Sequence, residues 1–218
     1  MNSKNVSFLT ALLSATCLVL IAAEPAEKSV SPDDALAKLT EGNSRFVSNK
    51  TSTAKPTAER RAATAQSQHP FAIIVGCSDS RTAPEIIFDQ NIGDLFVIRD
   101  AGNLVDDYAL GSIEYAVEHV GTRLIVVLGH GRCGAVKAAL ETATAPGHVG
   151  AIVRDIQPAV QAAKGKSGEA LVNAIHENAR EVADKIRKNL QIGDLASQVK
   201  VVSGYYDLDT GKVEWDKL

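Results

Sequence analysis

The sequence predicts an α/β fold in which helices flank a mainly parallel central β-sheet. Two apolar runs, Phe71–Gly76 and Leu124–Gly129, are short and uninterrupted, and each ends at a glycine. Strands buried on both faces have this pattern, which is typical of parallel sheets. Between the runs, residues 106–120 have the spacing of an amphipathic helix. Such a helix is the crossover that two parallel strands need.

The composition fits one globular domain. Of the 218 residues, 45% are hydrophobic and 22% are charged, which is enough for a full core. The net charge of −3 gives no electrostatic basis for binding nucleic acid or an acidic membrane surface. Three cysteines are too few for a dense disulfide framework. We therefore expect a single domain over residues 27–218.

Residues 1–26 have the pattern of a secretory signal peptide. Lys4 supplies a positive charge, and Phe8–Ala23 is apolar except for three hydroxyl side chains. Small residues that offer cleavage sites follow, namely Ala22, Ala23 and Ala26. The apolar run is short for a membrane-spanning helix, and an uncleaved anchor is the alternative. The prediction is a periplasmic or secreted protein that keeps no membrane segment after cleavage.

A helix is expected to begin after Ser31, which can cap it, with Pro32 at its first position and acidic residues in its first turn. Residues of one face then recur at helical spacing, namely Leu36, Leu39, Asn43 and Phe46. On this pattern alone, the helix covers the core of its own domain. An exposed connector over 51–55 and a short helix over 58–66 come next.

The rest of the chain alternates helices and strands. A short helix is expected over 84–88, a strand over 94–99, and a helix from Cys133 to about residue 142. A loop over 145–148 precedes an alanine-rich helical segment over 150–190, which we expect to break near Pro158 and Gly165. A hairpin of strands 199–207 and 211–215 closes the domain, with its turn around Thr210.

Reactive side chains follow both core strands. Cys77, Asp79 and Arg81 come after the first strand, and His130 and Cys133 come after the second. The carboxyl ends of parallel strands meet at one edge, where open α/β sheets place their sites. Asp79 and Arg81 alternate along a segment expected to be extended, so both can point to one side. A surface ion pair of little energetic consequence is the simpler interpretation of these two residues.

Two thiolates and one imidazole form a donor set suited to zinc. No fourth cysteine or histidine stands at a ligand spacing, and a catalytic zinc site keeps its fourth position for water. The alternative, two buried thiols or a disulfide between Cys77 and Cys133, leaves His130 without a role. Amides at the start of the helix after Cys133 are expected to favour the thiolate form of that cysteine.

Two motifs give the chain a resemblance to a known family. Cys77-Ser-Asp-Ser-Arg81, followed by Gly129-His-Gly-Arg-Cys-Gly134, resembles the signature pair of the β-class carbonic anhydrases. The similarity extends from about Ser31 to Trp215. It implies reversible hydration of carbon dioxide to bicarbonate and a proton by a zinc-bound hydroxide. It also implies one Zn²⁺ per chain, held by Cys77, His130 and Cys133.

The resemblance also assigns roles to other residues. Arg81 holds Asp79, which accepts a hydrogen bond from the hydroxide. In some family members this aspartate instead binds the zinc as a fourth ligand, in a closed state in which the enzyme is inactive. Gln68 matches a glutamine that hydrogen-bonds the substrate, and Phe96 and Tyr115 match aromatic residues lining the carbon dioxide pocket. The family further implies a homodimer or a dimer of dimers, with the N-terminal helices packing on a partner subunit.

The chain departs from the family pattern at two positions. Asp100 stands where an asparagine usually follows Arg99. Ile74 stands where members gated by bicarbonate have a tryptophan, so we expect that regulatory site to be missing and the zinc site to be open. Two other functions remain as alternatives. One is a related hydrolase of carbonyl sulfide or carbon disulfide, and the other is a zinc-binding or thiol-sensing protein without catalysis.

Overall fold

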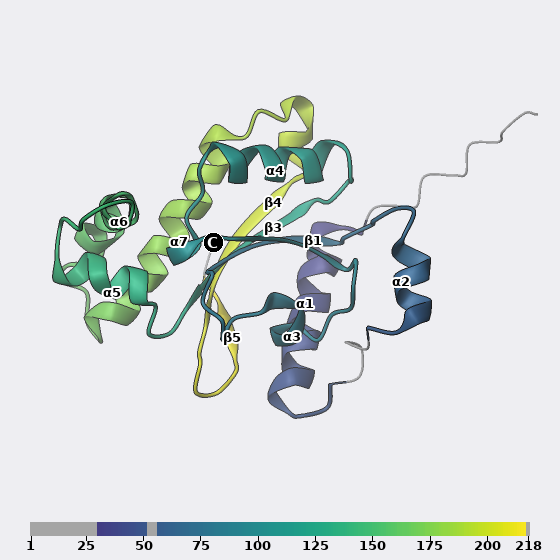
Figure 1. Ribbon diagram of the computed structural model, residues 1–218, viewed down its shortest axis with the longest axis horizontal. Coiled ribbons are helices and arrows are strands. Elements are labelled where there is room, and N and C mark those ends of the chain that lie inside the picture. The colour runs from purple at the N-terminus through teal and green to yellow at the C-terminus, as the bar shows by residue number, and fades with distance from the viewer. Residues whose placement is uncertain (1–29, 52–55, 217–218) are drawn as a thin grey trace, which may run out of the picture.

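Five strands form one sheet in the order β2-β1-β3-β4-β5 in a computed structural model that describes residues 30–51 and 56–216 (Figure 1). The strands are β1 (Ala72–Gly76), β2 (Leu95–Arg99), β3 (Leu124–His130), β4 (Lys200–Tyr206) and β5 (Val213–Trp215). The first four run parallel, and β5 pairs antiparallel with β4 as the terminal hairpin. Every residue of β1 and β3 is buried, which confirms the two apolar runs as core strands.

Helices cover both faces of this sheet. The α-helices of the described chain are α1 (Pro32–Val47), α2 (Ala58–Thr64), α3 (Pro84–Ile87), α4 (Asp107–Glu118), α5 (Gly134–Glu141), α6 (Val149–Ala163) and α7 (Ala170–Asn189). Of these, α1, α3, α4 and α7 pack on the faces of the sheet, whereas α2 has no buried residue. Two 3₁₀ helices that the sequence pattern did not indicate, η1 (Ala101–Asn103) and η2 (Gly193–Gln198), complete the described elements. The mixed α/β architecture with a mainly parallel sheet is therefore confirmed.

Alternate residues of each strand pack into opposite layers, because successive side chains of a strand point to opposite faces. On one face, Ile73 and Val75 pack with α4 and α7; on the other, Ala72 and Ile74 pack with α1 and α3 (Figure 1). A third apolar cluster lies beyond the carboxyl ends of β1 and β3, where α5, α6 and α7 meet. That end of the sheet carries the candidate site.

The first helix begins as its sequence predicts. The Ser31 side chain accepts a hydrogen bond from the backbone N–H of Asp34 at 3.1 Å, and proline occupies the first turn. Leu39 and Gly42 lie on its buried face, which packs on this chain's own core. A Cβ at Gly42 would clash with the carbonyl oxygen of Phe88, so close packing of α1 requires glycine there.

The break predicted near Pro158 is wrong, whereas the one near Gly165 is confirmed. Helix α6 runs through Pro158 and ends at Ala163; Gly165 follows with a φ of +76°. Proline removes one backbone donor and costs helix stability. The buried stripe of α6 continues on both sides of the proline, with Ile156 before it and Val160 after it. Packing of that stripe holds the helix together.

The signal peptide predicted over residues 1–26 lies outside the described residues, as does most of the connector predicted over 51–55. In the described ranges, no helix combines the length and the apolar character needed to cross a membrane.

Candidate active site

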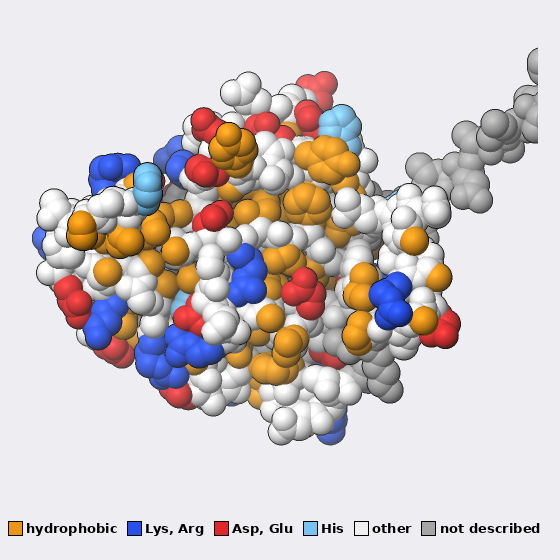
Figure 2. Space-filling view, in the orientation of Figure 1, with side chains coloured by type: hydrophobic (Ala, Val, Ile, Leu, Met, Phe, Trp, Pro, Cys, Tyr) orange, Lys and Arg blue, Asp and Glu red, His pale blue; other side chains and the backbone are white. Residues whose placement is uncertain are grey.

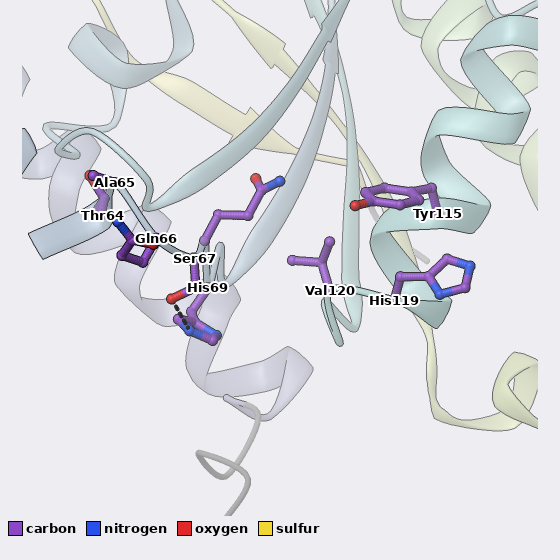
Figure 3. A pocket seen from close by; sticks show the side chains of 9 residues that line it. Thr64, Ala65, Gln66, Ser67, His69, Tyr115, His119 and Val120 are labelled. Atoms are coloured by element: carbon purple, nitrogen blue, oxygen red, sulfur yellow. Dashed lines mark hydrogen bonds between the residues drawn. The ribbon is translucent and has the colours of Figure 1, made fainter. Parts of the chain in front are cut away.

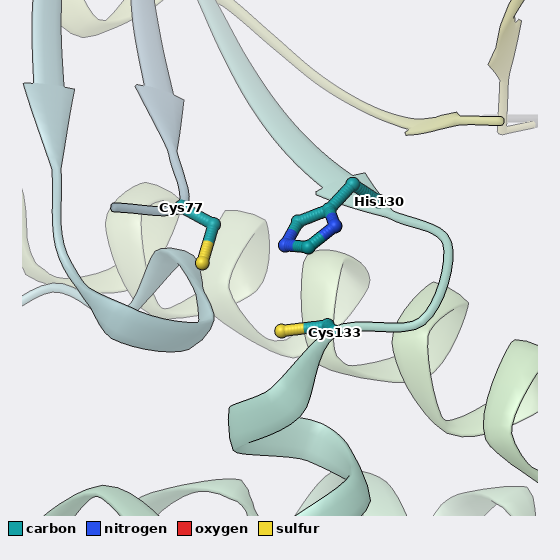
Figure 4. Close-up of side chains that lie close together, drawn as sticks. All are labelled: Cys77, His130 and Cys133. Carbon is teal, nitrogen blue, oxygen red and sulfur yellow. The ribbon is translucent and has the colours of Figure 1, made fainter. Parts of the chain in front are cut away.

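Three metal-ligating side chains converge at the carboxyl edge of the sheet. Cys77 follows β1, His130 is the last residue of β3, and Cys133 directly precedes α5. Their ligand atoms all lie within 4.8 Å of one another, and the side chains point toward a common centre (Figure 4). The parallel pairing of β1 with β3, in which Gly76 lies opposite Leu128, brings the two motifs together. The expected convergence is observed.

The hydrogen bonding of His130 leaves one ring nitrogen ready for a metal. Its Nδ1 lies 3.0 Å from the carbonyl oxygen of Gly131. A carbonyl can only accept, so Nδ1 carries the hydrogen and Nε2 has the lone pair. Nε2 is buried and has no hydrogen-bond partner. An unpaired buried acceptor is costly, and a bound cation would satisfy it.

The two sulfurs share a proton unequally. The pKa of the Cys77 thiol is lowered because Cys133 donates a hydrogen bond to it, while burial acts in the opposite direction. The pKa of the Cys133 thiol is raised by that same hydrogen bond and by burial. Amides of Ala135 and Val136 do act to lower the pKa of Cys133, as the sequence predicted, but they are outweighed. The predicted effect of the helix amides on Cys133 is therefore confirmed, although the neighbouring sulfur and burial act against it.

The donor set fits a zinc ion. Two sulfurs and an imidazole nitrogen are the ligands that zinc prefers, and metal binding displaces protons from cysteine. The shared proton and the unpaired Nε2 of His130 are the features that a dication would resolve. Both cysteines are free, so the alternative of a disulfide between Cys77 and Cys133 is absent from the described chain.

Asp79 lies beside this cluster and is held by Arg81. Arg81 Nε donates to Asp79 Oδ1 at 2.9 Å, and Nη2 donates to Oδ2 at 2.7 Å. Asp79 Oδ2 lies 4.0 Å from His130 Nε2. These hydrogen bonds from Arg81 hold the pKa of the Asp79 carboxyl well below its ordinary value. The carboxylate is therefore ionised, and it lies at the edge of the metal-ligating cluster.

The segment that carries this pair turns, and the expectation of an extended segment is wrong. The backbone N–H of Arg81 donates to Asp79 Oδ1 at 3.0 Å, and the N–H of Thr82 donates to the Asp79 carbonyl at 3.1 Å. Asp side chains favour such turns because they bond the backbone two residues on. The turn points both charged groups to the same side.

Sequence reasoning missed two residues that hold the Cys77–Asp79 backbone in place. Arg99, at the end of β2, donates from Nε to the Cys77 carbonyl at 2.8 Å and from Nη2 to the Asp79 carbonyl at 2.5 Å. Thr82 Oγ1 donates to the Asp79 carbonyl at 2.9 Å. Arg99 could have been found from its place at the carboxyl end of a predicted neighbouring strand. No sequence signal singles out Thr82.

The three residues matched to substrate binding lie elsewhere in the chain. Gln68 precedes β1, whereas Cys77 follows it, so the strand separates them by roughly 15 Å at about 3.3 Å per residue. Gln68 and Tyr115 line an open cavity of about 600 Å³ between residues 64–69 and α4. Figure 3 shows Tyr115 on the α4 side of this cavity, across from Ser67 and His69. Phe96 lies in β2 and packs against the core. Within one chain, these three residues therefore do not lie beside Cys77 and Cys133.

The structure places Ile74 and Asp100, the two residues that depart from the family pattern. Ile74 is fully buried in the layer that packs on α1 and α3. Asp100 follows β2, and the pKa of its carboxyl is raised by partial burial and by the nearby charge of Asp106. Both backbone groups of Asp100 are hydrogen-bonded. Its N–H donates to the Gly76 carbonyl, and its carbonyl accepts from the backbone N–H of Asn103.

An α/β sheet with a Cys₂His cluster at its carboxyl edge, beside an Asp–Arg pair, has the arrangement of side chains found in zinc enzymes. The family model described as carbonic anhydrase matches residues 72–213. The chain belongs to the β-carbonic anhydrase family.

Relatives of known name agree with this assignment. The chain is 41% identical over 192 residues to a carbonic anhydrase of Mycolicibacterium smegmatis, covering 84% of this chain and 93% of that protein. It is 40% identical over 196 residues to carbonic anhydrase 2 of Mycobacterium tuberculosis, covering 84% and 92%. Among solved structures, the β-carbonic anhydrase CafA of Aspergillus fumigatus superimposes with a TM-score of 0.67 at 26% identity, covering 85% of this chain and 90% of that one.

Proposed function

We propose that this protein is a carbonic anhydrase, a lyase that catalyses the reversible hydration of carbon dioxide to bicarbonate and a proton. The observation that carries the proposal is the buried cluster of Cys77, His130 and Cys133, with the ionised Asp79 at its edge. Family membership gives the reaction, and this cluster gives the chain the groups that the reaction needs.

One Zn²⁺ per chain would be held by Cys77 Sγ, His130 Nε2 and Cys133 Sγ. Three protein ligands leave a fourth position for water, as in catalytic zinc sites. When bound, zinc lowers the pKa of a water molecule from about 16 to about 7 and so supplies hydroxide near neutral pH. The chain's own contribution is to fix the three donors in a buried site, with His130 locked by its bond to Gly131.

Asp79 orients the attacking water and Arg81 orients Asp79. An ionised carboxylate can only accept hydrogen bonds, so a water beside Asp79 must turn a hydrogen toward it and a lone pair away from it. Two parallel hydrogen bonds from Arg81 fix the direction of the carboxylate. Arg99 donates hydrogen bonds to the Cys77 and Asp79 carbonyls, and these bonds fix the position of the turn relative to Cys77.

Gln68, Phe96 and Tyr115 would act at the site of a second copy of the chain, because they do not reach the cysteines of their own. The surface supports such a partner. β2 is an edge strand, and the large side chains of Ile86 and Tyr108 are 60% and 87% exposed. Figure 2 shows hydrophobic side chains gathered across the middle of one face of the molecule. We propose a homodimer or a dimer of dimers.

A stopped-flow assay of carbon dioxide hydration on the zinc-loaded full chain tests the function. We expect rapid hydration that disappears when zinc is removed by a chelator and returns when zinc is added. Carbonyl sulfide and carbon disulfide are run alongside. Zinc-loaded protein that hydrolyses them but does not hydrate carbon dioxide would overturn the proposal, and so would protein inactive on all three substrates.

A further inference from the structure

The loop after β2 contacts the metal site through one glycine. The backbone N–H of Gly102 donates to Cys77 Sγ at 3.3 Å. Gly102 has a φ of +73°, and a Cβ there would lie 2.9 Å from Ile156 Cδ1. The positive φ therefore favours glycine, and the end of the Ile156 side chain packs closely against it. Glycine is also the residue whose backbone is least restrained by itself, so something else must hold it.

Helix α7 fastens this loop at two points. Asn178 Nδ2 donates to the Gly102 carbonyl at 2.7 Å, and Lys185 Nζ donates to the Val105 carbonyl at 2.6 Å. Residues 178 and 185 are seven apart and so lie on the same side of the helix. The carbonyl that Asn178 holds belongs to the same residue whose N–H bonds Cys77.

Asn178 is an unusual choice for its position. It is 1% exposed and lies on a helix face that is otherwise built from small and aliphatic side chains such as Ala174 and Ile175. A buried amide is costly unless it is hydrogen-bonded, and an apolar residue could fill this place. A cavity of about 150 Å³ lies beside it, lined by Leu104 and Val105 of the loop. The hydrogen bonds from Asn178 and Lys185 therefore hold the loop beside this cavity, in addition to the packing of Leu104 and Val105.

We propose that Asn178 is a positioning residue of the metal site, which acts on the ligand Cys77 by fixing Gly102. An N–H donor on a thiolate withdraws electron density from the sulfur and sets how strongly it donates to the metal. Groups that orient a ligand in this way typically change metal affinity or activity by about 10–100-fold. The inference rests on the proposed function only in that the metal is zinc.

The test compares Asn178→Leu with a matched control. Leucine keeps the branched skeleton of asparagine and removes the donor. Thr122→Val is the control, because Thr122 is also buried and donates to a backbone carbonyl, that of Pro70 at 2.8 Å, before β1 and away from the site. Zinc affinity is measured by competition with a chromogenic chelator. The cobalt-substituted proteins give the sulfur-to-metal charge-transfer band.

We expect Asn178→Leu to bind zinc about 10–100-fold more weakly, and its charge-transfer band to move to longer wavelength, because a sulfur without its hydrogen bond is more easily oxidised. Thr122→Val should keep the wild-type affinity and band. A folded Asn178→Leu protein with unchanged affinity and band would overturn the proposal. Should that variant fail to fold, the same two measurements on Asn178→Ala decide, with the same expected and overturning results. Neither zinc affinity nor the cobalt charge-transfer band depends on carbon dioxide hydration. Wild-type protein that fails to hydrate carbon dioxide would therefore overturn the proposed function and leave this inference untouched.

Discussion

At the carboxyl edge of the sheet, one hydrogen bond decides what His130 can do. Because Nδ1 donates to the Gly131 carbonyl, Nε2 faces the two sulfurs with a free lone pair. The sequence predicted that these three side chains converge, from their place after two strands, but it did not predict how the two thiols influence each other. That depends on the distance between the sulfurs of Cys77 and Cys133, which only the folded chain sets.

Removal of one ligand should empty the site. Cys133→Ser and His130→Ala should each lose most of the bound zinc and the activity, because two remaining ligands cannot complete a three-donor site. Elemental analysis of the purified proteins gives zinc per chain. His148→Ala is the control, because His148 lies on the surface before α6 and should keep one zinc per chain. A folded Cys133→Ser protein with full zinc and full activity would refute the ligand set.

Asp79→Asn should keep the zinc and lose activity. An amide presents donors as well as an acceptor, so it cannot orient the water as a carboxylate does. The expected loss is about 2–4 kcal/mol of transition-state stabilisation, as for one hydrogen-bond partner in a polar active site. Arg81→Lys should also be costly, because an ammonium cannot make two parallel hydrogen bonds to the carboxylate. Stopped-flow rates together with zinc content separate this role from metal loss.

The pH profile of the wild type tests the same pair. The pKa of Asp79 is lowered, so its carboxylate would take up a proton only below its ordinary pKa of about 3.9. Activity should therefore fall smoothly on acidification, because the hydroxide that zinc would supply is converted to water, and not because Asp79 is protonated. The expected open site remains a prediction. A crystal of the zinc protein near pH 8 with an Asp79 oxygen on the metal would contradict it.

At the scale of elements, the hydrophobic pattern of the sequence predicted the strands and helices that core packing holds in place. The core strands, the capped first helix and the terminal hairpin are all confirmed, because each has a local signal: an apolar run, a capping serine or a turn. The continuous α6 was missed, because its stability depends on burial across Pro158. The Asp79–Arg81 turn and the η1 loop were also missed, since hydrogen bonds from distant Arg99 and Asn178 shape them.

Two helical glycines should respond to alanine in opposite directions. Gly42 of α1 meets the Phe88 carbonyl, whereas Gly111 of α4 is exposed and a Cβ there meets nothing within 4 Å. Gly111→Ala should stabilise the fold by about 0.5–1 kcal/mol through helix propensity. Gly42→Ala should destabilise it by about 1–3 kcal/mol through overpacking. Urea unfolding of both variants measures the difference, and equal shifts would contradict the tight packing of α1.

At the scale of the whole molecule, we propose that the N-terminal segment directs export and so sets the compartment in which the site operates. We propose that residues 1–26 are removed on export, which leaves Cys77 and Cys133 as the cysteines of the exported chain. Oxidising compartments favour disulfides, and bound zinc would keep both sulfurs as ligands there.

Mass spectrometry of protein recovered from the periplasm or the medium tests export. We expect a mature N-terminus between Ala23 and Glu27, because small residues that suit cleavage follow the apolar run. Soluble cytoplasmic protein that still begins at Met1 would show that this segment is not an export signal.

Gln68 and Tyr115, the residues matched to substrate binding, line a cavity away from Cys77, and this placement makes a prediction about pairs of chains. Gln68→Ala/Tyr115→Ala should bind zinc normally and hydrate carbon dioxide more slowly, with roughly 0.5–1.5 kcal/mol lost for the hydrogen bond alone. Cys77→Ser should be inactive. In a purified heterodimer of these two variants, labelled with different tags, one site would carry both lesions. The other would combine intact ligands from one chain with intact Gln68 and Tyr115 from its partner.

That heterodimer should therefore regain one wild-type site, seen in stopped-flow assays as a return of the wild-type rate constant at half the wild-type number of sites. If the residues served the cysteines of their own chain, the heterodimer would show only the slow rate of the double variant, because every site with zinc would still lack them. A double variant as active as the wild type would remove Gln68 and Tyr115 from the reaction altogether. Recovery is the outcome expected from a structure in which Gln68 precedes β1 and Cys77 follows it.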